Sequence, residues 1–380
     1  MKKLFLILCL ILTPSLAFAS GYCGAWGSTG GGTSPWTVSS DAGGTASAAY
    51  ADVNACVNTT AAAGETVLVP TASATWSSTL TITKSLTLTG AGTGCPDACV
   101  DNTTLTSDGS TLLIKVDVTA DVTLDISGFY LNANGHTRAL QFETDVGVRV
   151  YNFRFHHNKI ANGSEYTVAI YGHWWGLIDN NYFTDNDYNF KVLNCSSQAC
   201  DNYAWDNYAG VDNLGSVHYL YIESNIFNNV GTWVNTSGNG TRWVFRHNTV
   251  NDSGLYWMHD VHGDTSNRGV VAVEIYENTY DFEGGAAGLV DFRGGTGIIF
   301  NNTENNYAGW GARIRPREEL NYCSQNEPGT CSGSVTATCD TGGPAYDVVN
   351  NSYFWANTQS ASMEHQSNDD PYGCIDEDTE

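Results

Sequence analysis

The hydrophobic pattern of this chain is a short repeat: an apolar residue, two spacers, an asparagine, a spacer and usually a second apolar residue. The repeat occurs seven times, with its asparagine at Asn158, Asn181, Asn225, Asn248, Asn278, Asn302 and Asn351. Successive asparagines are 23–30 residues apart or about twice that distance, which is the period of stacked supersecondary units. The unit is rich in strand-like segments and poor in helical ones, so the pattern predicts the coils of a β-solenoid.

Each asparagine is expected at a tight corner between strands, since asparagine tolerates left-handed backbone angles and can bond its own main chain. Stacked coils then align the asparagines in a ladder. In two opening coils glycine takes the corner, at Gly90 and Gly128. Aligning the corners places one outward column just before them: Ser127, His156, Asp179, Glu223, Arg246, Tyr276 and Phe300.

Helical periodicity is convincing only between Ser47 and Ala63, where one face carries Tyr50, Val53, Cys56 and Val57. This segment directly precedes the first expected strand, residues 66–70. We expect the helix to cover the open end of the first coil, whose edge and interior otherwise face water.

The expected organisation follows from these patterns: a signal peptide over 1–19, a lead-in and capping helix over 20–65, a parallel β-helix over 66–357 and an acidic tail over 358–380. The signal combines Lys2-Lys3, an apolar run too short to span a membrane, and the small-x-small site Ala17-Phe18-Ala19. Residues 20–46 are rich in Gly, Ser and Thr and are expected to be loose. Two cysteine-containing insertions interrupt the period, at 195–211 and 321–345.

The net charge limits the kinds of partner expected for this chain, and the cysteine content predicts disulfides. Without Lys2 and Lys3 there are 14 basic against 40 acidic residues, which changes the formal charge from −24 to −26. Such a surface repels nucleic acid and anionic lipid, so neither nucleic-acid binding nor membrane insertion is expected. Ten cysteines remain after the signal, an even number that predicts disulfides in a secreted chain. The closest pairs are Cys95/Cys99, Cys195/Cys200 and Cys323/Cys331, and we expect bridges above all in the last two.

Taken together, the glycine and asparagine corners resemble those of the right-handed parallel β-helix superfamily, the pectate-lyase-like fold, over roughly residues 48–357. The resemblance implies an all-β fold, a right-handed parallel β-helix with a short N-terminal capping helix. It does not select one function, because the superfamily includes pectate, pectin and alginate lyases, polygalacturonases, tailspikes and adhesins.

Basic residues are rare in this chain, yet several fall on the strands expected after the corners. These strands are predicted to form a second column that contains His173, Lys191, His259, Asp260, Asp291, Arg293, Arg313 and Arg315, with Trp233 and Trp257 nearby. Tryptophan rings stack on sugars, and Lys or Arg side chains bind carboxylates. We therefore predict a groove for an extracellular, anionic polysaccharide. The alternative is an ordinary solvated face on which the basic residues neutralise local acids.

The densest polar motif runs from Trp257 to Gly269 and includes His259, Asp260, His262 and Asp264. These side chains suit acid/base catalysis or metal binding. Calcium on Asp260 and Asp264 suits a secreted acidic protein better than zinc does. A polar hydrogen-bonded loop is the alternative.

The favoured function is a secreted lyase that cleaves uronic-acid polysaccharide by β-elimination, which needs a cation, a base and an acid. The candidate catalytic residues are Lys191, His259, His262 and Arg293, and the candidate substrate-binding residues are His173, Trp233, Trp257, Asp291, Arg313 and Arg315.

Two other functions stay open. A glycoside hydrolase needs two carboxylates, for which Asp260 and Asp291 are candidates, and Arg313-Ile-Arg315 resembles the Arg-Ile-Lys of polygalacturonases. The third reading is a non-catalytic glycan-binding or adhesin solenoid.

Overall fold

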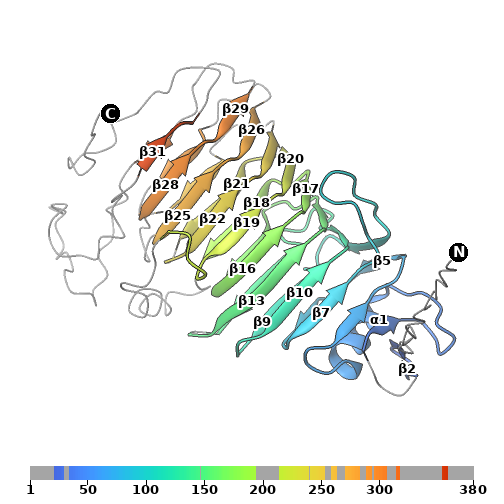
Figure 1. Cartoon of the computed structure of the whole chain (residues 1–380). Coiled ribbons are helices and arrows are strands. Elements are labelled where there is room, and N and C mark those ends of the chain that lie inside the picture. Colours follow the sequence, from blue (N-terminus) through green and yellow to red (C-terminus); the bar gives the residue numbers. More distant parts are fainter. Residues whose placement is uncertain are drawn as a thin grey trace, which may run out of the picture.

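The computed structural model describes residues 21–29, 34–145, 147–193, 214–238, 240–252, 258–262, 270–282, 288–292, 295–305, 314–316 and 353–357. Over these residues the chain is a right-handed parallel β-helix with three sheets (Figure 1). From β4 onward each coil gives one strand to each sheet, so sheet neighbours come from successive coils. The predicted fold class is confirmed.

Among the described residues, the 13-stranded sheet is called the long sheet, and the two 9-stranded sheets that follow it along each coil are called the second and third sheets. The long sheet contains, in spatial order, β2 (Gly27–Ser28), β1 (Gly21–Gly24), β3 (Trp36–Val38), β4 (Thr66–Leu68), β7 (Leu86–Thr89), β10 (Thr123–Ser127), β13 (Arg149–His156), β16 (His173–Asp179), β19 (Leu220–Glu223), β22 (Arg242–Arg246), β25 (Ala272–Tyr276), β28 (Thr296–Phe300) and β31 (Tyr353–Trp355). The second sheet contains β5 (Ala72–Trp76), β8 (Thr103–Ser107), β11 (Tyr130–Asn132), β14 (Lys159–Ala161), β17 (Tyr182–Thr184), β20 (Ile226–Val230), β23 (Thr249–Asp252), β26 (Thr279–Phe282) and β29 (Thr303–Asn305). The third sheet contains β6 (Leu80–Ile82), β9 (Ile114–Val118), β12 (Leu140–Thr144), β15 (Tyr166–Tyr171), β18 (Tyr188–Leu193), β21 (Trp233–Gly238), β24 (His259–Val261), β27 (Val290–Phe292) and β30 (Ile314–Pro316).

The core is one continuous column inside the coils. Alternate residues of each strand point inward, and equivalent inward residues of successive coils stack on one another. Phe183 and Phe227, for example, lie one coil apart with ring centroids 4.8 Å apart and planes inclined by 7°. This burial of apolar side chains is the main force that holds the coils together.

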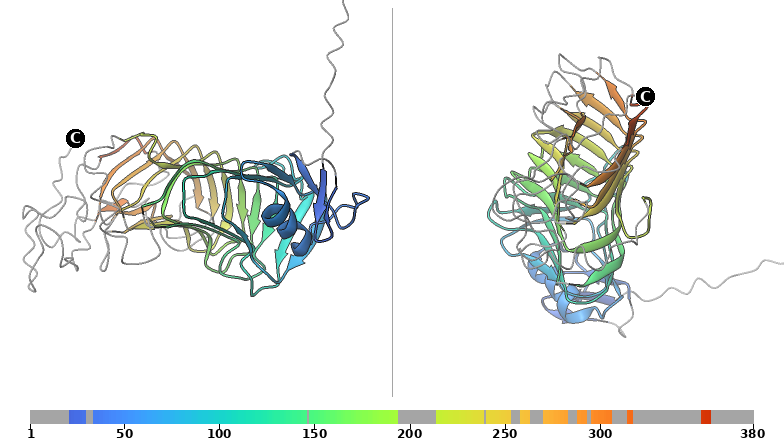
Figure 2. Two further views of the ribbon diagram at one scale, coloured as in Figure 1. Left: turned by 90° about the horizontal axis from the view of Figure 1, so that it is seen from below. Right: turned by 90° about the vertical axis from the view of Figure 1, so that its left-hand side faces the viewer.

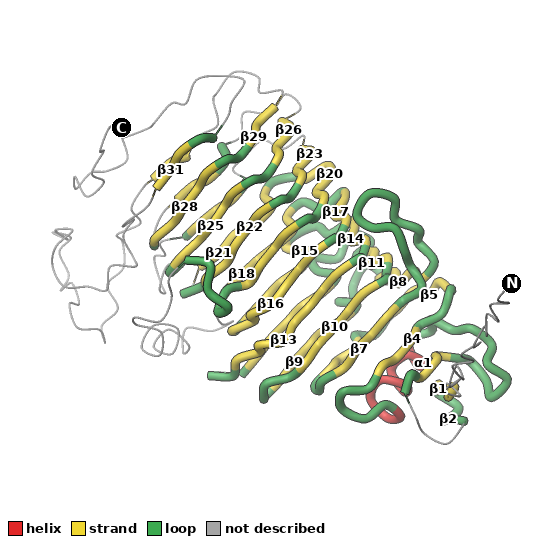
Figure 3. Tube along the Cα trace, in the orientation of Figure 1, coloured by secondary structure: helices red, strands yellow, loops and turns green. Residues whose placement is uncertain are grey.

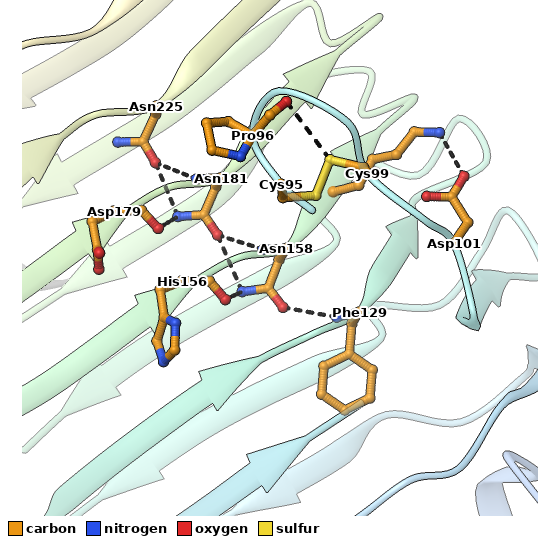
Figure 4. The surroundings of a disulfide bond; sticks show 11 residues. Cys95, Pro96, Cys99, Asp101, Phe129, His156, Asn158, Asp179, Asn181 and Asn225 are labelled. Atoms are coloured by element: carbon orange, nitrogen blue, oxygen red, sulfur yellow. Dashed lines mark hydrogen bonds and ion pairs between the residues drawn. A yellow bond between two sulfur atoms is a disulfide. The ribbon is translucent and has the colours of Figure 1, made fainter. Parts of the chain in front are cut away.

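An asparagine ladder joins the corners between the long sheet and the second sheet (Figure 4). The side-chain Oδ1 of each rung accepts hydrogen bonds from the backbone N–H and the Nδ2 of the preceding rung, as Asn181 does from Asn158 at 3.0 and 3.1 Å. The first rung, Asn158, accepts from the backbone N–H of Phe129, directly after the glycine corner. A Cβ on Gly90 would lie 2.2 Å from the carbonyl oxygen of Gly128, which explains why glycine stands there.

Two details of the predicted ladder are wrong. The left-handed residue is the one before each asparagine, for example His157 with φ 52° and Ser224 with φ 56°, while the asparagine side chain bonds the carbonyl two residues earlier. The rung after Asn302 is Asn357, whose Oδ1 accepts from Asn302 at 2.9 and 3.1 Å. Asn351 lies outside the described residues.

The predicted helix is present at the N-terminal end of the coils (Figure 2). It consists of α1 (Tyr50–Ala55), which continues as the π-helical turn η1 (Cys56–Thr60). Val53, Cys56 and Val57 of the predicted face are fully buried, and the ring of Tyr50 contacts Trp76 of β5 at 5.6 Å between centroids. Figure 3 shows that the described helical residues are confined to this end.

The segment before the helix is not loose where the structure describes it. Its strands β1 and β3 pair in parallel and extend the long sheet to β4. A disulfide between Cys23 and Cys56 ties β1 to the helix, and a second one joins Cys95 to Cys99. The expected bridges Cys195–Cys200 and Cys323–Cys331 lie outside the described residues and stay predictions.

The interior of the last described coils contains a carboxyl group. Glu304 points inward from β29 and is 3% exposed, and neither side-chain oxygen has a hydrogen-bond partner in the described part of the chain. Burial raises the pKa of Glu304 to about 8. The folded state therefore favours the protonated carboxylic acid.

Glu304→Gln is expected to remove a component of the pH dependence of stability. Because the folded pKa of Glu304 is raised, the contribution of this group to stability is fully present below the unfolded pKa near 4.5. It is lost as the pH rises through about 8. We expect wild type to lose about 3–5 kcal/mol relative to Glu304→Gln between pH 4.5 and 9. Urea unfolding of both proteins across this range measures the difference. Parallel curves would contradict the assignment.

Candidate functional site

The outer face of the third sheet brings together part of the predicted groove. The strand register places Lys191 beside Thr236, Thr236 beside Asp260, Asp260 beside Asp291, and Asp291 beside Arg315. These positions form one column that runs across five strands, with neighbouring strands about 4.8 Å apart. For Arg315 only the backbone is described.

Lys191 of β18 lies half-buried on this face. Its Nζ is 4.7 Å from the ring centroid of Tyr166, a cation–π contact. Burial and, to a smaller extent, the positive charge of Arg138 lower the pKa of Lys191. Both effects disfavour the charged ammonium, so a larger share of Lys191 than of an exposed lysine is the neutral amine, which is the form that accepts a proton.

Aromatic rings border Lys191 along the helix axis. Tyr166, Tyr188 and Trp233 come from three successive coils, with centroids 5.0 Å apart for the first pair and 5.9 Å apart for the second. Their planes are inclined by 47° and 66°, and each ring is partly exposed. Burial, with smaller contributions from Tyr188 and Asp260, raises the pKa of Tyr166 to about 12. The row offers apolar ring surface next to a cation.

An acid/base pair lies two strands from Lys191. His262, at the end of β24, places its Nε2 2.6 Å from Oδ2 of Asp260. Asp260 is fully buried and also accepts a hydrogen bond from Thr236 Oγ1 at 3.3 Å, whereas the side chain of His262 is 36% exposed. A buried carboxylate that orients an exposed imidazole is an arrangement that moves protons to and from a bound molecule.

Sequence reasoning missed the cation on the other side of Lys191. Arg138 donates from Nη1 to Gln141 at 2.9 Å and lies 5.6 Å from the ring centroid of Tyr171. Its buried Nε has no hydrogen-bond partner within the described part of the chain. Arg138 precedes β12, in a loop whose positions the corner repeat does not align between coils.

His259 was wrongly placed on the groove wall. It is adjacent to Asp260 on one strand and therefore points the opposite way, into the core, where it is fully buried. Its ring lies 4.6 Å from Phe245, and its Nε2 is 2.8 Å from the hydroxyl of Tyr280. Burial lowers the pKa of His259 to about 3. This histidine is a neutral core residue and does not contact a ligand on the outer face.

The remaining predicted site residues lie either elsewhere in the fold or outside the described residues. His173 is buried at the corner between the third and long sheets, not on the outer face with Lys191. Outside the described residues lie Trp257, Asp264, Arg293 and Arg313.

Calcium binding stays a prediction. Among the described residues no group of three or more His, Cys, Asp or Glu side chains is arranged to hold a metal ion. Oδ2 of Asp260 is engaged by His262 at 2.6 Å. The second proposed ligand, Asp264, lies outside the described residues.

The predicted outward column of the long sheet is confirmed by the strand register from Ser127 to Phe300. Its charges are satisfied between neighbouring coils. Arg154 donates to both oxygens of Asp179 at 2.9 and 2.7 Å, and His156 Nε2 lies 3.1 Å from Asp125. We interpret this column as a set of cross-coil stabilising contacts.

Comparisons with protein-family models, with curated proteins and with solved structures found no match. No helix among the described residues is long and apolar enough to cross a membrane.

Proposed function

We propose that this protein is a secreted polysaccharide lyase of the pectate-lyase-like β-helix type, acting on a uronic-acid polymer by β-elimination. The observation that carries the proposal is the juxtaposition of Lys191, whose pKa is lowered, with the Asp260–His262 pair and a row of aromatic rings on one outer face. Secretion is supported by the signal-peptide pattern predicted for residues 1–19 and by the two disulfides.

The proposed reaction uses the chain's own groups. Lys191 takes the proton from C5 of the uronate, and the electrons of that C–H bond form the C4=C5 double bond. The bond from C4 to the glycosidic oxygen breaks, and protonated His262, held by Asp260, donates a proton to the leaving oxygen. Arg138 binds the uronate carboxylate and stabilises the negative charge that develops next to C5.

The test is incubation of residues 20–380 with a panel of uronic-acid and neutral polysaccharides. A lyase produces an unsaturated sugar whose new double bond absorbs in the ultraviolet. We expect this product from a uronic-acid polymer and not from a neutral glycan. New reducing ends without ultraviolet absorbance would reject the lyase.

One observation favours a hydrolase as the second candidate. Asp260 and Asp291 are register partners on neighbouring strands, 0% and 4% exposed. A separation of about 5 Å between carboxyl groups is that of a retaining glycosidase. Reducing ends without a double bond, lost in Asp291→Asn, would support this reaction, whereas binding without any cleavage would support a glycan-binding solenoid.

A further inference from the structure

A separate pocket lies where the third sheet turns into the long sheet, at the start of β16. Its lining includes Gly172, His173, Trp175, Gly240, Thr241 and Arg242. The side chains of His173 and Arg242 are buried, with 6% and 8% of each residue exposed. The pocket has room for about one water-sized atom, so a single oxygen of a ligand can enter while the rest of the ligand stays at its mouth.

Aromatic rings form the side of this pocket. Trp175 packs against Tyr151, at 4.9 Å between centroids, and against His218, at 4.5 Å. Tyr151 is 45% exposed and is one of the few large apolar side chains so exposed among the described residues. An exposed ring beside a polar pocket is a surface on which the apolar face of a sugar can pack.

Two arginines supply positive charge. Arg149 is the register partner of His173, and Arg242 lines the pocket directly. Burial, followed by the charges of Arg149 and Arg242, lowers the pKa of His173 to about 4. The imidazole is therefore neutral at neutral pH, and the cationic character comes from the guanidinium groups, which bind carboxylates through paired hydrogen bonds.

A hydroxyl group in the pocket wall points to a ligand independently of the charges. Thr241 is 1% exposed, and its Oγ1 has no hydrogen-bond partner within the described part of the chain. A buried hydroxyl without a partner costs about 1–3 kcal/mol. An acceptor atom that enters the pocket removes this cost.

We propose that this pocket is a second carbohydrate-binding site, distinct from the face with Lys191, and that it takes one carboxylate oxygen of an acidic sugar. The carboxylate accepts hydrogen bonds from Arg242 and Thr241, and the sugar ring packs on Tyr151 at the mouth. Binding is non-covalent and does not depend on cleavage at the other face. The site would hold a uronic-acid chain on the protein at a second point.

The experiment measures binding of a free uronic acid monosaccharide, glucuronate or galacturonate, to residues 20–380 by calorimetry or ligand-observed NMR. Glucose and galactose serve as the neutral counterparts. Thr241→Val keeps the side-chain shape and removes the hydroxyl, and it is expected to weaken uronate binding about tenfold, the equivalent of one charge-assisted hydrogen bond. Tyr151→Ala is expected to weaken it about 5–10-fold.

Two controls separate this site from the cleavage site. Tyr353→Ala removes another exposed tyrosine of the long sheet, 60% exposed, and should leave uronate affinity unchanged. Lys191→Met should lower the rate of polymer cleavage by about 10²–10⁴-fold and preserve monosaccharide binding at the pocket. Equal affinity for uronate and neutral sugar, or wild-type affinity in both Thr241→Val and Tyr151→Ala, would overturn the proposal while cleavage by wild type continued.

Discussion

Lys191→Met is expected to lower the rate of polysaccharide cleavage by about 10²–10⁴-fold, the usual effect of removing a positioned acid/base group. Methionine keeps the length of the side chain and its packing against Tyr166, so the fold is expected to persist. The expected loss is in kcat, because Lys191 is proposed to act on the proton at C5 in the transition state. Initial rates of double-bond formation, measured over a range of substrate concentrations, give this quantity.

The matched control is Lys159→Met. Lys159 also lies over a tyrosine, with Nζ 4.3 Å from the ring centroid of Tyr130, but on the second sheet, where it pairs with Asp101. It should retain full activity. Since the reaction needs both the neutral amine of Lys191 and the protonated imidazole of His262, the wild-type rate should rise and then fall as the pH increases. Equal rates for Lys191→Met and wild type would remove Lys191 from the mechanism.

The candidate site was predictable only where the corner repeat aligned equivalent positions of successive coils. It placed Lys191, Asp260 and Asp291 on one set of strands, and the register puts their side chains in one column. It failed for His259 because neighbouring residues of a strand point to opposite faces, so an error of one position exchanges core for surface. In the sequence His259 stands between Met258 and Asp260, and these neighbours do not show which face of the strand it occupies.

Other parts of the site could not be reached from the sequence. Two strands follow each corner, not one, and the loop between them varies in length from coil to coil. The repeat therefore does not say which residue of one coil stands beside Arg138 or Tyr166. The contact of Arg138 with Tyr171, the pairing of His262 with Asp260 and the pocket beside Trp175 are all tertiary results of these loops.

The fold was far more predictable, because one local device is repeated and each copy enforces the next. The apolar-x-x-Asn phrase carries both the inward residue and the corner side chain, so its recurrence specifies parallel stacking. What it does not specify is the backbone: the left-handed angle falls on residues as different as His157, Glu277 and Ala356. The last rung was assigned to Asn351 because that segment matches the full phrase, whereas Phe354-Trp-Ala-Asn357 keeps only its first half.

Asn225→Leu is expected to destabilise the protein by about 3–5 kcal/mol, the upper end of single-residue effects. Asn225 is 1% exposed and its Oδ1 accepts from the backbone N–H and Nδ2 of Asn181 at 2.9 and 3.0 Å. Its Nδ2 donates to the carbonyl oxygens of Ile178 and Glu223 and to Oδ1 of Asn248. Leucine has a similar size but leaves these buried backbone groups unpaired. The positive φ belongs to Ser224, so backbone strain does not contribute.

Guanidinium unfolding of Asn225→Leu and of Asn152→Leu separates the ladder from the general effect of replacing an asparagine. Asn152 is exposed on β13, and its replacement should change the free energy of unfolding by less than about 0.5 kcal/mol. Because the rungs bond one another, the loss at Asn225 should also exceed the sum of isolated hydrogen bonds. Equal unfolding midpoints for the two variants would mean that apolar stacking alone holds successive coils in register, and that the ladder only follows it.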